Sequence, residues 1–393
     1  MKKRDRNFFR PALPGRAFIL PVIAAGIFFC TPSGANGKYP VKKFAVTDFS
    51  VTNLREKPDF PSELGNQLLM GTPVEIIDSA GYWRQVASPE PYRAWCVDMS
   101  LAEMDSTELA AYIAAPKFIF TNWHGHLYER PDVNSVRISD LVTGDLLCAI
   151  KPSADGGTDG KGHPQKRRRT DGRKGKFIKV WLPSGRAGYV LKKNVEVFSD
   201  WAAKTEASAS GIISAAEKFL GVPYLWGGTS VKGVDCSGFT RMVFFLNGVL
   251  LPRNASRQAM SGKEIPVEIS RPALSSGGEL PEPQMKGEML RRIALLEPGD
   301  LIFFGTKETD GPGEEERDRI THVGIYVGNG RFIHASRIVR RGSLIPGDED
   351  YYDLSYKMIA ARRVIGEEDK GTGIIRILHS PAYFPRENQP RQD

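Results

Sequence analysis

Cysteine is scarce in this chain of 393 residues, which holds four: Cys30, Cys96, Cys148 and Cys236. No two of them have the CxxC spacing, and no other metal-binding motif occurs, so we expect neither a metal nor another cofactor. If Cys30 leaves with an export signal, the number that remains is odd. At least one thiol then stays free even in an oxidising compartment. The sequence alone does not place Cys96 and Cys148 within bonding distance.

Long apolar runs are equally scarce, and the clearest one, residues 17–30, is too short to be a clear membrane span. Six basic residues precede it, and small residues at 33–35 offer a cleavage site. These features predict a secretory signal over residues 1–36, so we expect an exported protein, periplasmic or associated with the cell envelope. An uncleaved anchor and a lipid on Cys30 are the alternatives. The bulky residues 28–29 disfavour the lipid.

A nucleic-acid partner is not expected, although the formal net charge is +8. Six basic residues and one acidic residue among residues 1–36 account for +5 of that charge, so +3 remains once the signal is removed. The second basic cluster, residues 166–169, lies in a glycine-rich stretch with few apolar residues and is interpreted as a solvated loop. Weak attraction to anionic wall polymer or to a membrane is its alternative role.

The first half of the chain contains an internal repeat. Residues 54–58 (LREKP) match residues 127–131 (LYERP) at an offset of 73. Farther on, residues 95–97 (WCV) align with residues 188–190 (GYV) at an offset of 93, because the basic loop lengthens the second copy. Each copy holds short β-rich runs broken by glycine, proline and aspartate, a pattern typical of small β-barrels.

The order of these features resembles that of bacterial SH3-like domains, most clearly in the first copy. That copy has an arginine three residues before a proline, a glycine before a strand, and then a tryptophan strand. The resemblance implies two SH3-like barrels, one over residues 37–115 and one over residues 116–200 with the basic loop inserted. A short helix is predicted at residues 106–114, between the copies.

From about residue 208 the composition changes, and a glycine-rich turn at residues 223–228 (PYLWGG) leads to Cys236. From Phe239 onward apolar residues recur at helical spacing, and Asp235 and Ser237 are residue types that cap helices. Cys236 is therefore expected at a helix N-terminus, where the helix dipole lowers the pKa of a thiol. A small buried structural cysteine is the alternative.

Two histidines are the candidate partners of this cysteine. Residues 321–327 alternate as a strand that places His322 on the face opposite three apolar side chains. The following GNG sequence is a strong hairpin signal. If Val327 pairs with Arg331, then His322 and His334 become diagonal neighbours on one face of the sheet.

Cys236, His322 and His334 together have the residue types of a nucleophile, a base and an orienting group. We expect the Cys236 thiolate and the His322 imidazolium to form an ion pair near neutral pH. A zinc site made of the same three residues is the alternative by ligand type. The helix start and the glycine-rich approach favour the nucleophile.

Three segments stand outside this pattern. Residues 261–292 are rich in glycine, proline and glutamate without a clear period, and we interpret them as an inserted loop. Residues 310–319 are acidic and are expected to be mobile. The tail after Glu367 is rich in charge and proline and is expected to fray.

Six stretches in order, PYLWGG, DCSGF, RNASRQ, PGDLIFF, THVGIYVGNG and FIHAS, resemble the NlpC-type cell-wall cysteine peptidases. That family has a compact papain-like α+β fold. The match covers about residues 208–365 and implies a catalytic domain over residues 201–370, followed by a C-terminal tail at residues 371–393. In the family, the positions of Cys236, His322 and His334 are the nucleophile, the base and the orienting group.

With two SH3-like domains in front, the chain resembles the subgroup that cleaves γ-D-glutamyl–diamino-acid bonds in murein peptides. This implies a hydrolase that acts on L-Ala-γ-D-Glu-diamino-acid peptides with a free N-terminal L-Ala, through a thioester. We expect it to be a monomer. A non-catalytic wall-binding protein with a degenerate peptidase fold is one alternative. An acyltransferase that uses the same three residues is another.

The candidate substrate-binding residues come from both halves of the chain. The resemblance implies that Tyr224 faces the cleft and that Ser237 and Ser256 bind polar groups of the substrate. A buried ammonium group needs carboxylate partners, and Asp235 and Glu63 are the two candidates.

The repeat supports a special role for Glu63. At the offset of 73, the second copy has Val136 in its place. A carboxylate is therefore not required by the repeat itself. Trp95 is expected to form part of the wall of the same ammonium-binding site.

Overall fold

A computed structural model describes residues 43–90, 92–152, 175–267, 282–308 and 317–385. The predicted export signal with Cys30, the basic residues 166–169 and the acidic residues 310–316 lie outside these ranges. Residues 42–393 group as one compact unit. None of the helices in the described ranges is long and apolar enough to cross a membrane.

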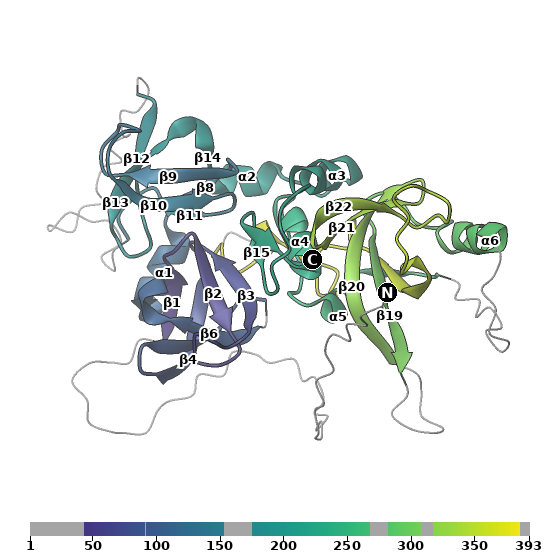
Figure 1. Ribbon diagram of the computed structural model, residues 1–393. Coiled ribbons are helices and arrows are strands. Elements are labelled where there is room, and N and C mark those ends of the chain that lie inside the picture. Colours follow the sequence, from purple (N-terminus) through teal and green to yellow (C-terminus); the bar gives the residue numbers. More distant parts are fainter. Residues whose placement is uncertain (1–42, 91, 153–174, 268–281, 309–316, 386–393) are drawn as a thin grey trace, which may run out of the picture. The chain divides into compact units, whose positions relative to one another are not determined.

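The described chain begins with two sheets of seven strands each (Figure 1). The first contains β1 (Phe44–Thr47), β2 (Val51–Arg55), β3 (Leu64–Leu69), β4 (Pro73–Ala80), β5 (Trp83–Ala87), β6 (Arg93–Val97) and β7 (Leu101–Met104). The second contains β8 (Lys117–Phe120), β9 (His124–Tyr128), β10 (Arg137–Val142), β11 (Leu146–Cys148), β12 (Phe177–Trp181), β13 (Ala187–Leu191) and β14 (Val195–Val197). Their strand orders, β3-β2-β6-β5-β4-β1-β7 and β10-β9-β13-β12-β11-β8-β14, agree position by position and confirm the repeat.

The alignment of the later strands needs a correction of one residue. Strands β5 and β12 begin at Trp83 and Phe177, which are 94 residues apart rather than 93. Trp95 therefore corresponds to Tyr189, since each pairs with the end of the second strand of its sheet. With an offset of 93 residues, buried side chains of one copy would align with exposed side chains of the other, because successive side chains of a strand point to opposite faces of the sheet.

Closed SH3-like barrels are not found among the described strands. In each sheet the order runs from one edge strand to the other, and the two edge strands do not pair. Edge strand β3 instead bonds to a side chain from the second half of the chain. The Gln67 N–H donates to Thr229 Oγ1 over 3.2 Å, and that hydroxyl donates to the Gln67 carbonyl over 2.6 Å. The predicted helix between the sheets is confirmed as α1 (Ser106–Ala114), which Asp105 caps.

The second half of the chain is a mixed α/β structure around a sheet of order β18-β23-β19-β20-β21-β22. Its strands are β18 (Lys263–Ile265), β19 (Leu301–Glu308), β20 (Arg317–Gly328), β21 (Arg331–Ser336), β22 (Ile338–Ser343) and β23 (Met358–Arg363). The short pairs are β15 (Thr229–Ser230) with β16 (Gly233–Val234), and β17 (Val249–Leu250) with β24 (Ile375–Arg376). The helices are α2 (Phe198–Lys204), α3 (Ala209–Lys218), α4 (Cys236–Phe245), α5 (Ala255–Gln258), α6 (Glu282–Arg292) and the 3-10 turn η4 (Ser355–Lys357).

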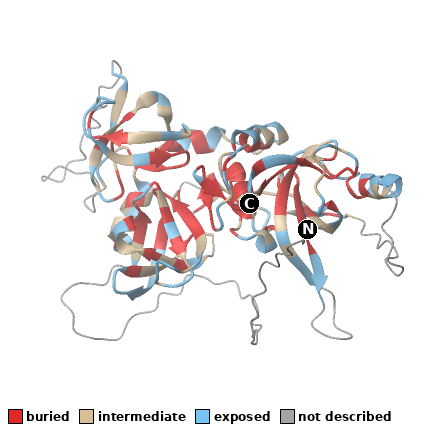
Figure 2. Ribbon diagram, in the orientation of Figure 1, coloured by how far each residue is buried: buried red, intermediate tan, exposed pale blue. Residues whose placement is uncertain are grey.

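One apolar core holds α4 against this sheet. Phe239 and Val243 of α4 are fully buried, as are Val323 and Ile325 of β20. Figure 2 shows buried residues along the strands and exposed residues at the far ends of β19 and β20. The strand that carries His322 and the helix that begins at Cys236 are thus parts of one packed core.

Two sequence expectations are wrong. The predicted loop at residues 261–292 contains strand β18 and helix α6, with Met289 buried; its residues 268–281 lie outside the described ranges. The tail does not fray up to residue 385, because β24 pairs with β17 and Tyr383 is 7% exposed. Both segments bury apolar side chains against distant parts of the chain, which local composition does not reveal.

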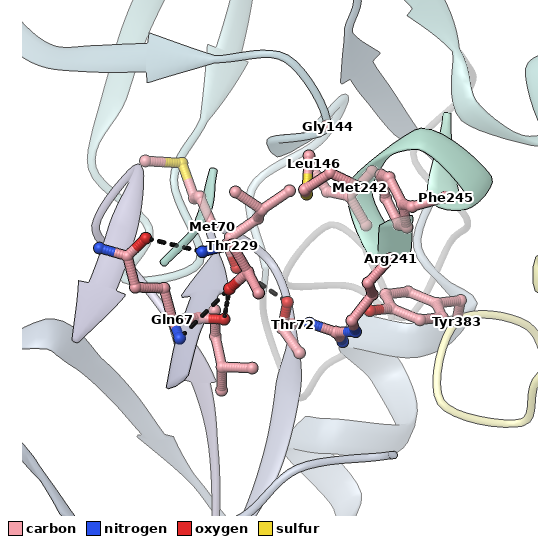
Figure 3. A pocket seen from close by; sticks show the side chains of 12 residues that line it. Gln67, Met70, Thr72, Gly144, Leu146, Thr229, Arg241, Met242, Phe245 and Tyr383 are labelled. Atoms are coloured by element: carbon pink, nitrogen blue, oxygen red, sulfur yellow. Dashed lines mark hydrogen bonds between the residues drawn. The ribbon is translucent and has the colours of Figure 1, made fainter. Parts of the chain in front are cut away.

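A buried ion pair joins the first sheet to α4. Arg241 of α4 lies 2.6 Å from the carboxylate of Glu90, and the two side chains are 12% and 10% exposed. Burial is the largest single influence and lowers the pKa of Arg241, but the charge of Glu90, its hydrogen bond and the Tyr383 charge together raise that pKa overall. Figure 3 shows Arg241 beside Tyr383 and Thr72.

Breaking this ion pair on one side should destabilise the protein strongly. Glu90→Ala is expected to lower the free energy of unfolding by about 3–5 kcal/mol, because it leaves the Arg241 charge buried without a partner. The double variant Glu90→Leu/Arg241→Met should recover most of that loss. Urea unfolding followed by tryptophan fluorescence measures each variant.

The control is Glu217→Ala, which removes an exposed partner of Arg341. It should cost less than about 1 kcal/mol. Equal losses for Glu90→Ala and Glu217→Ala would show that the buried pair does not hold the sheet to α4.

Candidate active site

Cys236 is the first residue of α4, which confirms the predicted helix start. Asp235 is the N-cap residue, and its Oδ1 accepts a hydrogen bond from the Gly238 N–H over 2.7 Å. The thiol is within hydrogen-bonding reach of the backbone N–H groups of Val323 and Ser237. Because Val323 follows His322 in β20, the thiol lies beside the backbone of the candidate base.

The Asp235 carboxylate has a full set of partners inside the protein. Its Oδ2 accepts from the Gly227 N–H over 3.0 Å, and both of its oxygens pair with Arg253. The Arg253 side chain is 4% exposed and also donates to Asn66 Oδ1 in β3 over 2.8 Å. Asp235 therefore caps α4 and holds Arg253, a set of contacts different from the ammonium contact expected from the sequence.

The two candidate histidines are in direct contact. His322 Nε2 lies 2.7 Å from His334 Nδ1. Strands β20 and β21 pair with Ile325 opposite Ile333, the register expected for the two histidines. A bulge nearer the turn, however, places Gly328 rather than Val327 opposite Arg331.

The tight turn between these strands is confirmed by its backbone. Asn329 and Gly330 have φ values of 53° and 74°, the left-handed pair that a two-residue hairpin turn requires. The turn fixes how β21 returns along β20. It thereby sets the position of His334 relative to His322.

The hydrogen bond between the histidines determines which nitrogen can take a proton. Since His322 Nε2 bonds to His334, only His322 Nδ1 is available to accept the thiol proton. That transfer requires the tautomer in which His322 Nε2–H donates to His334 Nδ1. His334 then carries its own proton on Nε2, which is buried without a hydrogen-bond partner in the described part of the chain.

Burial dominates the electrostatics of the site. It raises the pKa of the Cys236 thiol to about 11, with a smaller contribution from the Asp235 charge and opposition from the Val323 and Ser237 amides. It lowers the pKa of His322 to about 4, and Arg340 acts in the same direction. The expected lowered thiol pKa is therefore wrong in direction, and near neutral pH the free site holds a neutral thiol beside a neutral imidazole.

His334 is held neutral in the same way. Burial lowers its pKa to about 2, helped by His322 and Arg340. Rings of Phe332 and Tyr352 pack around it, with centroids 4.6 and 5.0 Å from the His334 ring. In the described residues, no group of three or more His, Cys, Asp or Glu side chains is placed to hold a metal ion.

A pocket open to solvent lies beside His322. Its lining comes from the β19–β21 strands, the chain before α4 and the segment around η4: Tyr224, Phe304, Thr321, His322, Ala335, Ser336, Arg337, Tyr352, Leu354 and Lys357. Tyr224 thus lies next to the candidate base. Its N–H donates to the Arg337 carbonyl over 2.8 Å.

The other proposed binding residues lie at different places. Ser237 is buried, and its hydroxyl contacts Asp235 and Arg253. Ser256 is exposed in α5. Glu63 is exposed just before β3, and Trp95 is half-buried in β6, with no described contact between either and the three candidate catalytic residues.

The first sheet nevertheless reaches the loop that precedes Cys236. A Cβ added at Gly227 would lie 2.3 Å from the Leu64 carbonyl oxygen, so only glycine fits between the two segments. Glu63 directly precedes Leu64 and lies close enough to Tyr92 to contribute to the raised pKa of that tyrosine, although burial is its main cause. The loop that carries Glu63 therefore borders the catalytic half of the chain.

Sequence reasoning missed Arg253, Asn66, Arg337 and Tyr352 as parts of the site. Arg253 begins the RNASRQ stretch, which could have drawn attention to it. Arg337 has φ of 66°, a backbone feature that no sequence pattern reveals. Tyr352 lies far from both histidines in sequence, and only the fold brings its ring against theirs.

Comparison with known proteins gives consistent matches. Residues 221–358 match the model of the NlpC/P60 family. A gamma-D-glutamyl-L-lysine dipeptidyl-peptidase of Bacillus cereus is 25% identical over 314 residues, 77% of this chain and 76% of that protein. A dipeptidyl-peptidase 6 of Lysinibacillus sphaericus is 23% identical over 296 residues, 74% and 87% of the two chains.

A solved structure shares the fold. The crystal structure of an NlpC/P60 family protein from Bacillus cereus superposes with a TM-score of 0.59 at 22% identity, over 82% of this chain and 99% of that chain. At that identity the likeness concerns the fold alone.

The raised thiol pKa predicts how Cys236 reacts without substrate. The rate constant for alkylation by iodoacetamide should rise about tenfold per pH unit between pH 6 and 9, because the thiolate fraction does so below the thiol pKa. Mass spectrometry of the modified peptide measures the rate at Cys236. Cys96 and Cys148 serve as internal controls, since burial raises the pKa of each to about 12. A rate independent of pH over this range would instead reveal the thiolate–imidazolium pair.

Proposed function

Because residues 221–358 form a domain of the NlpC/P60 family, we propose that this peptidase is exported and hydrolyses the γ-D-glutamyl–diamino-acid bond of peptidoglycan stem peptides that have a free N-terminal L-Ala. The observation that carries the proposal is the 2.7 Å contact of His322 with His334, next to a cysteine at the start of α4. The name of the Bacillus cereus relative, a gamma-D-glutamyl-L-lysine dipeptidyl-peptidase, supports the γ-glutamyl bond as the target.

The first half of the reaction follows from a neutral thiol and a neutral imidazole. The Cys236 sulfur attacks the γ-glutamyl carbonyl carbon while its proton passes to His322 Nδ1. Negative charge develops on the carbonyl oxygen, where the Cys236 N–H at the positive end of α4 stabilises it. His322 then gives the proton to the leaving amine, the C–N bond breaks, and a thioester remains on Cys236.

The second half uses the same groups with water. His322 takes a proton from a water molecule as its oxygen attacks the thioester carbonyl. The C–S bond breaks, the proton returns to the sulfur, and the dipeptide leaves with a free γ-carboxyl group. His334 orients His322 throughout, and its Nδ1 accepts from Nε2–H of the transient imidazolium.

The amino end of the substrate is proposed to lie toward the first sheet. Glu63 is exposed beside the contact of Leu64 with Gly227, so its carboxylate borders the approach to Cys236. We assign it the ammonium group of L-Ala, while Trp95 supplies a wall, and Ser237 and Ser256 contact polar groups of the peptide. Asp235 contributes through Arg253 and the α4 cap.

The remaining organisation is part of the same proposal. The two seven-stranded sheets are SH3-like modules within residues 37–115 and 116–200, and the catalytic domain covers residues 201–370. A signal at residues 1–36 directs export to the periplasm or cell envelope, and the enzyme acts as a monomer.

The function is tested with two peptides, L-Ala-γ-D-Glu-L-Lys and its N-acetylated form. The wild type should release L-Ala-γ-D-Glu from the free peptide and strongly prefer it, and Cys236→Ala should release none. Glu63→Gln should lower kcat/KM for the free peptide about tenfold, because one charge-assisted hydrogen bond is lost. The same variant should leave kcat/KM for the acetylated peptide unchanged. Mass spectrometry of the products measures each rate.

The matched control is Glu75→Gln, an exposed acid of β4 in the same sheet, which should change neither rate. Equal cleavage of the two peptides by the wild type would refute recognition of the amine. Failure of the wild type to cut either peptide would refute the proposed function, and ligated products would indicate an acyltransferase.

A further inference from the structure

The C-terminal segment, residues 377–384, packs against elements that are far away in the sequence. It begins with the 3-10 turn η5 (Ile377–His379), directly after β24 pairs with β17. Tyr383 and Phe384 then pack against Phe198 of α2, with ring centroids 6.2 and 4.9 Å from the Phe198 ring. The segment follows the residues that match the family model, which end at 358.

Tyr383 contacts the first sheet, the second sheet and α4 at one place. Its side chain lines the cavity of Figure 3 together with Thr72 between β3 and β4, Leu146 of β11 and Arg241 of α4. The Tyr383 hydroxyl is within hydrogen-bonding reach of the Thr72 side chain. Burial is the main cause that raises the pKa of Tyr383, so this hydroxyl keeps its proton at neutral pH. A buried hydroxyl needs a partner, and Thr72 supplies one.

Thr72 connects this contact to strand β3. Its hydroxyl donates to the carbonyl of Leu69, the last residue of β3, over 2.8 Å. The opposite end of β3 begins at Leu64, directly after Glu63. Glu63 is the residue to which the substrate ammonium group is assigned. Strand β3 therefore joins the Tyr383 contact at one end to the proposed amine site at the other.

Strand β3 is an edge strand, so its outer side depends on the catalytic half of the chain. There, Thr229 bonds to Gln67 and Arg253 bonds to Asn66, both near the middle of the strand. A strand held near its middle can tilt about that point, and a tilt moves Glu63, which lies four residues before Gln67, at about 3.3 Å per residue. A second hold at the far end of β3 prevents that tilt.

We propose that Tyr383 is a positioning residue: by holding the far end of β3 against α4, it keeps Glu63 at the distance from Cys236 that the amino half of the substrate requires. The inference rests on the proposed function and adds a distant segment of the chain to recognition of the substrate amine. Coupling between distant sites travels through packed side chains and rigid secondary elements. Here the coupled elements are the Tyr383 ring, Thr72 and β3.

The test compares L-Ala-γ-D-Glu-L-Lys with its N-acetylated form, in which an amide replaces the ammonium group. Tyr383→Ala should lower kcat/KM for the free peptide about tenfold, because a displaced carboxylate no longer bonds to the ammonium group. It should change kcat/KM for the acetylated peptide less than about twofold. A loss of folded protein would lower both rates by the same factor, so the ratio of the two rates isolates the positioning effect.

A double variant tests whether Tyr383 acts through Glu63. If the two residues serve one contact, Tyr383→Ala/Glu63→Gln should lower kcat/KM for the free peptide about tenfold, hardly more than either single variant. Independent effects would instead multiply to about a hundredfold. Tyr383→Phe keeps the ring and removes the hydroxyl, so it should lower kcat/KM for the free peptide about threefold, the effect of one neutral hydrogen bond.

Met289→Ala is the matched control. Met289 and Tyr383 are similarly buried, at 5% and 7% exposed, but Met289 packs in the apolar cluster between α6 and the catalytic sheet. Its replacement should lower the midpoint of thermal unfolding and leave the ratio of the two peptide rates unchanged.

The outcomes separate the inference from the function beneath it. Equal losses for the two peptides in Tyr383→Ala, or about a hundredfold loss in the double variant, would refute the role of Tyr383 and leave the proposed function standing. If Tyr383→Ala does not fold, an unchanged ratio of rates in Tyr383→Phe refutes that role. If the wild type cuts neither peptide, the proposed function fails and the inference fails with it.

Discussion

One carboxylate, that of Asp235, holds the parts of the site together. It caps α4, so it fixes the backbone of Cys236, and it accepts from Gly227 in the glycine-rich loop. It also pairs with the buried Arg253, which bonds to Asn66 in the first sheet. The candidate nucleophile, the glycine-rich loop and the first sheet are thus joined through one buried network, in which each charge has its partner and the cost of burial is offset.

The second constraint is the burial of the three candidate catalytic side chains. The core that positions α4 against β20 packs against Cys236, and a second apolar cluster packs Phe304, Phe332 and Tyr352 against the two imidazoles. Burial therefore opposes every charged form of the three groups. A site of this kind stores no ion pair before substrate binds. In the proposed reaction, charge arises only as the sulfur attacks, and the groups proposed to stabilise it are the start of α4, the Val323 amide and His334.

The local features of the fold could be predicted from the sequence, and the long-range ones could not. Capping residues and apolar spacing marked the helix start at Cys236, and the GNG turn marked the hairpin that joins the two histidines. The sequence pattern did not reveal the bulge near Val327 or the 94-residue offset of the later strands, because a shift of one residue leaves the local composition unchanged. The contact of Arg253 with Asn66 joins residues 187 apart, and the direction of the thiol pKa depends on burial that no local pattern reports.

In the proposed reaction, Cys236 forms a covalent thioester with the acyl half of the substrate. The most direct test of this step is to mix the enzyme with L-Ala-γ-D-Glu-L-Lys, quench in acid within the first turnover, and determine the mass of the protein and of its peptides. An L-Ala-γ-D-Glu acyl group is expected on the peptide that contains Cys236. Release of product while Cys236 is unmodified at every quench time would contradict it.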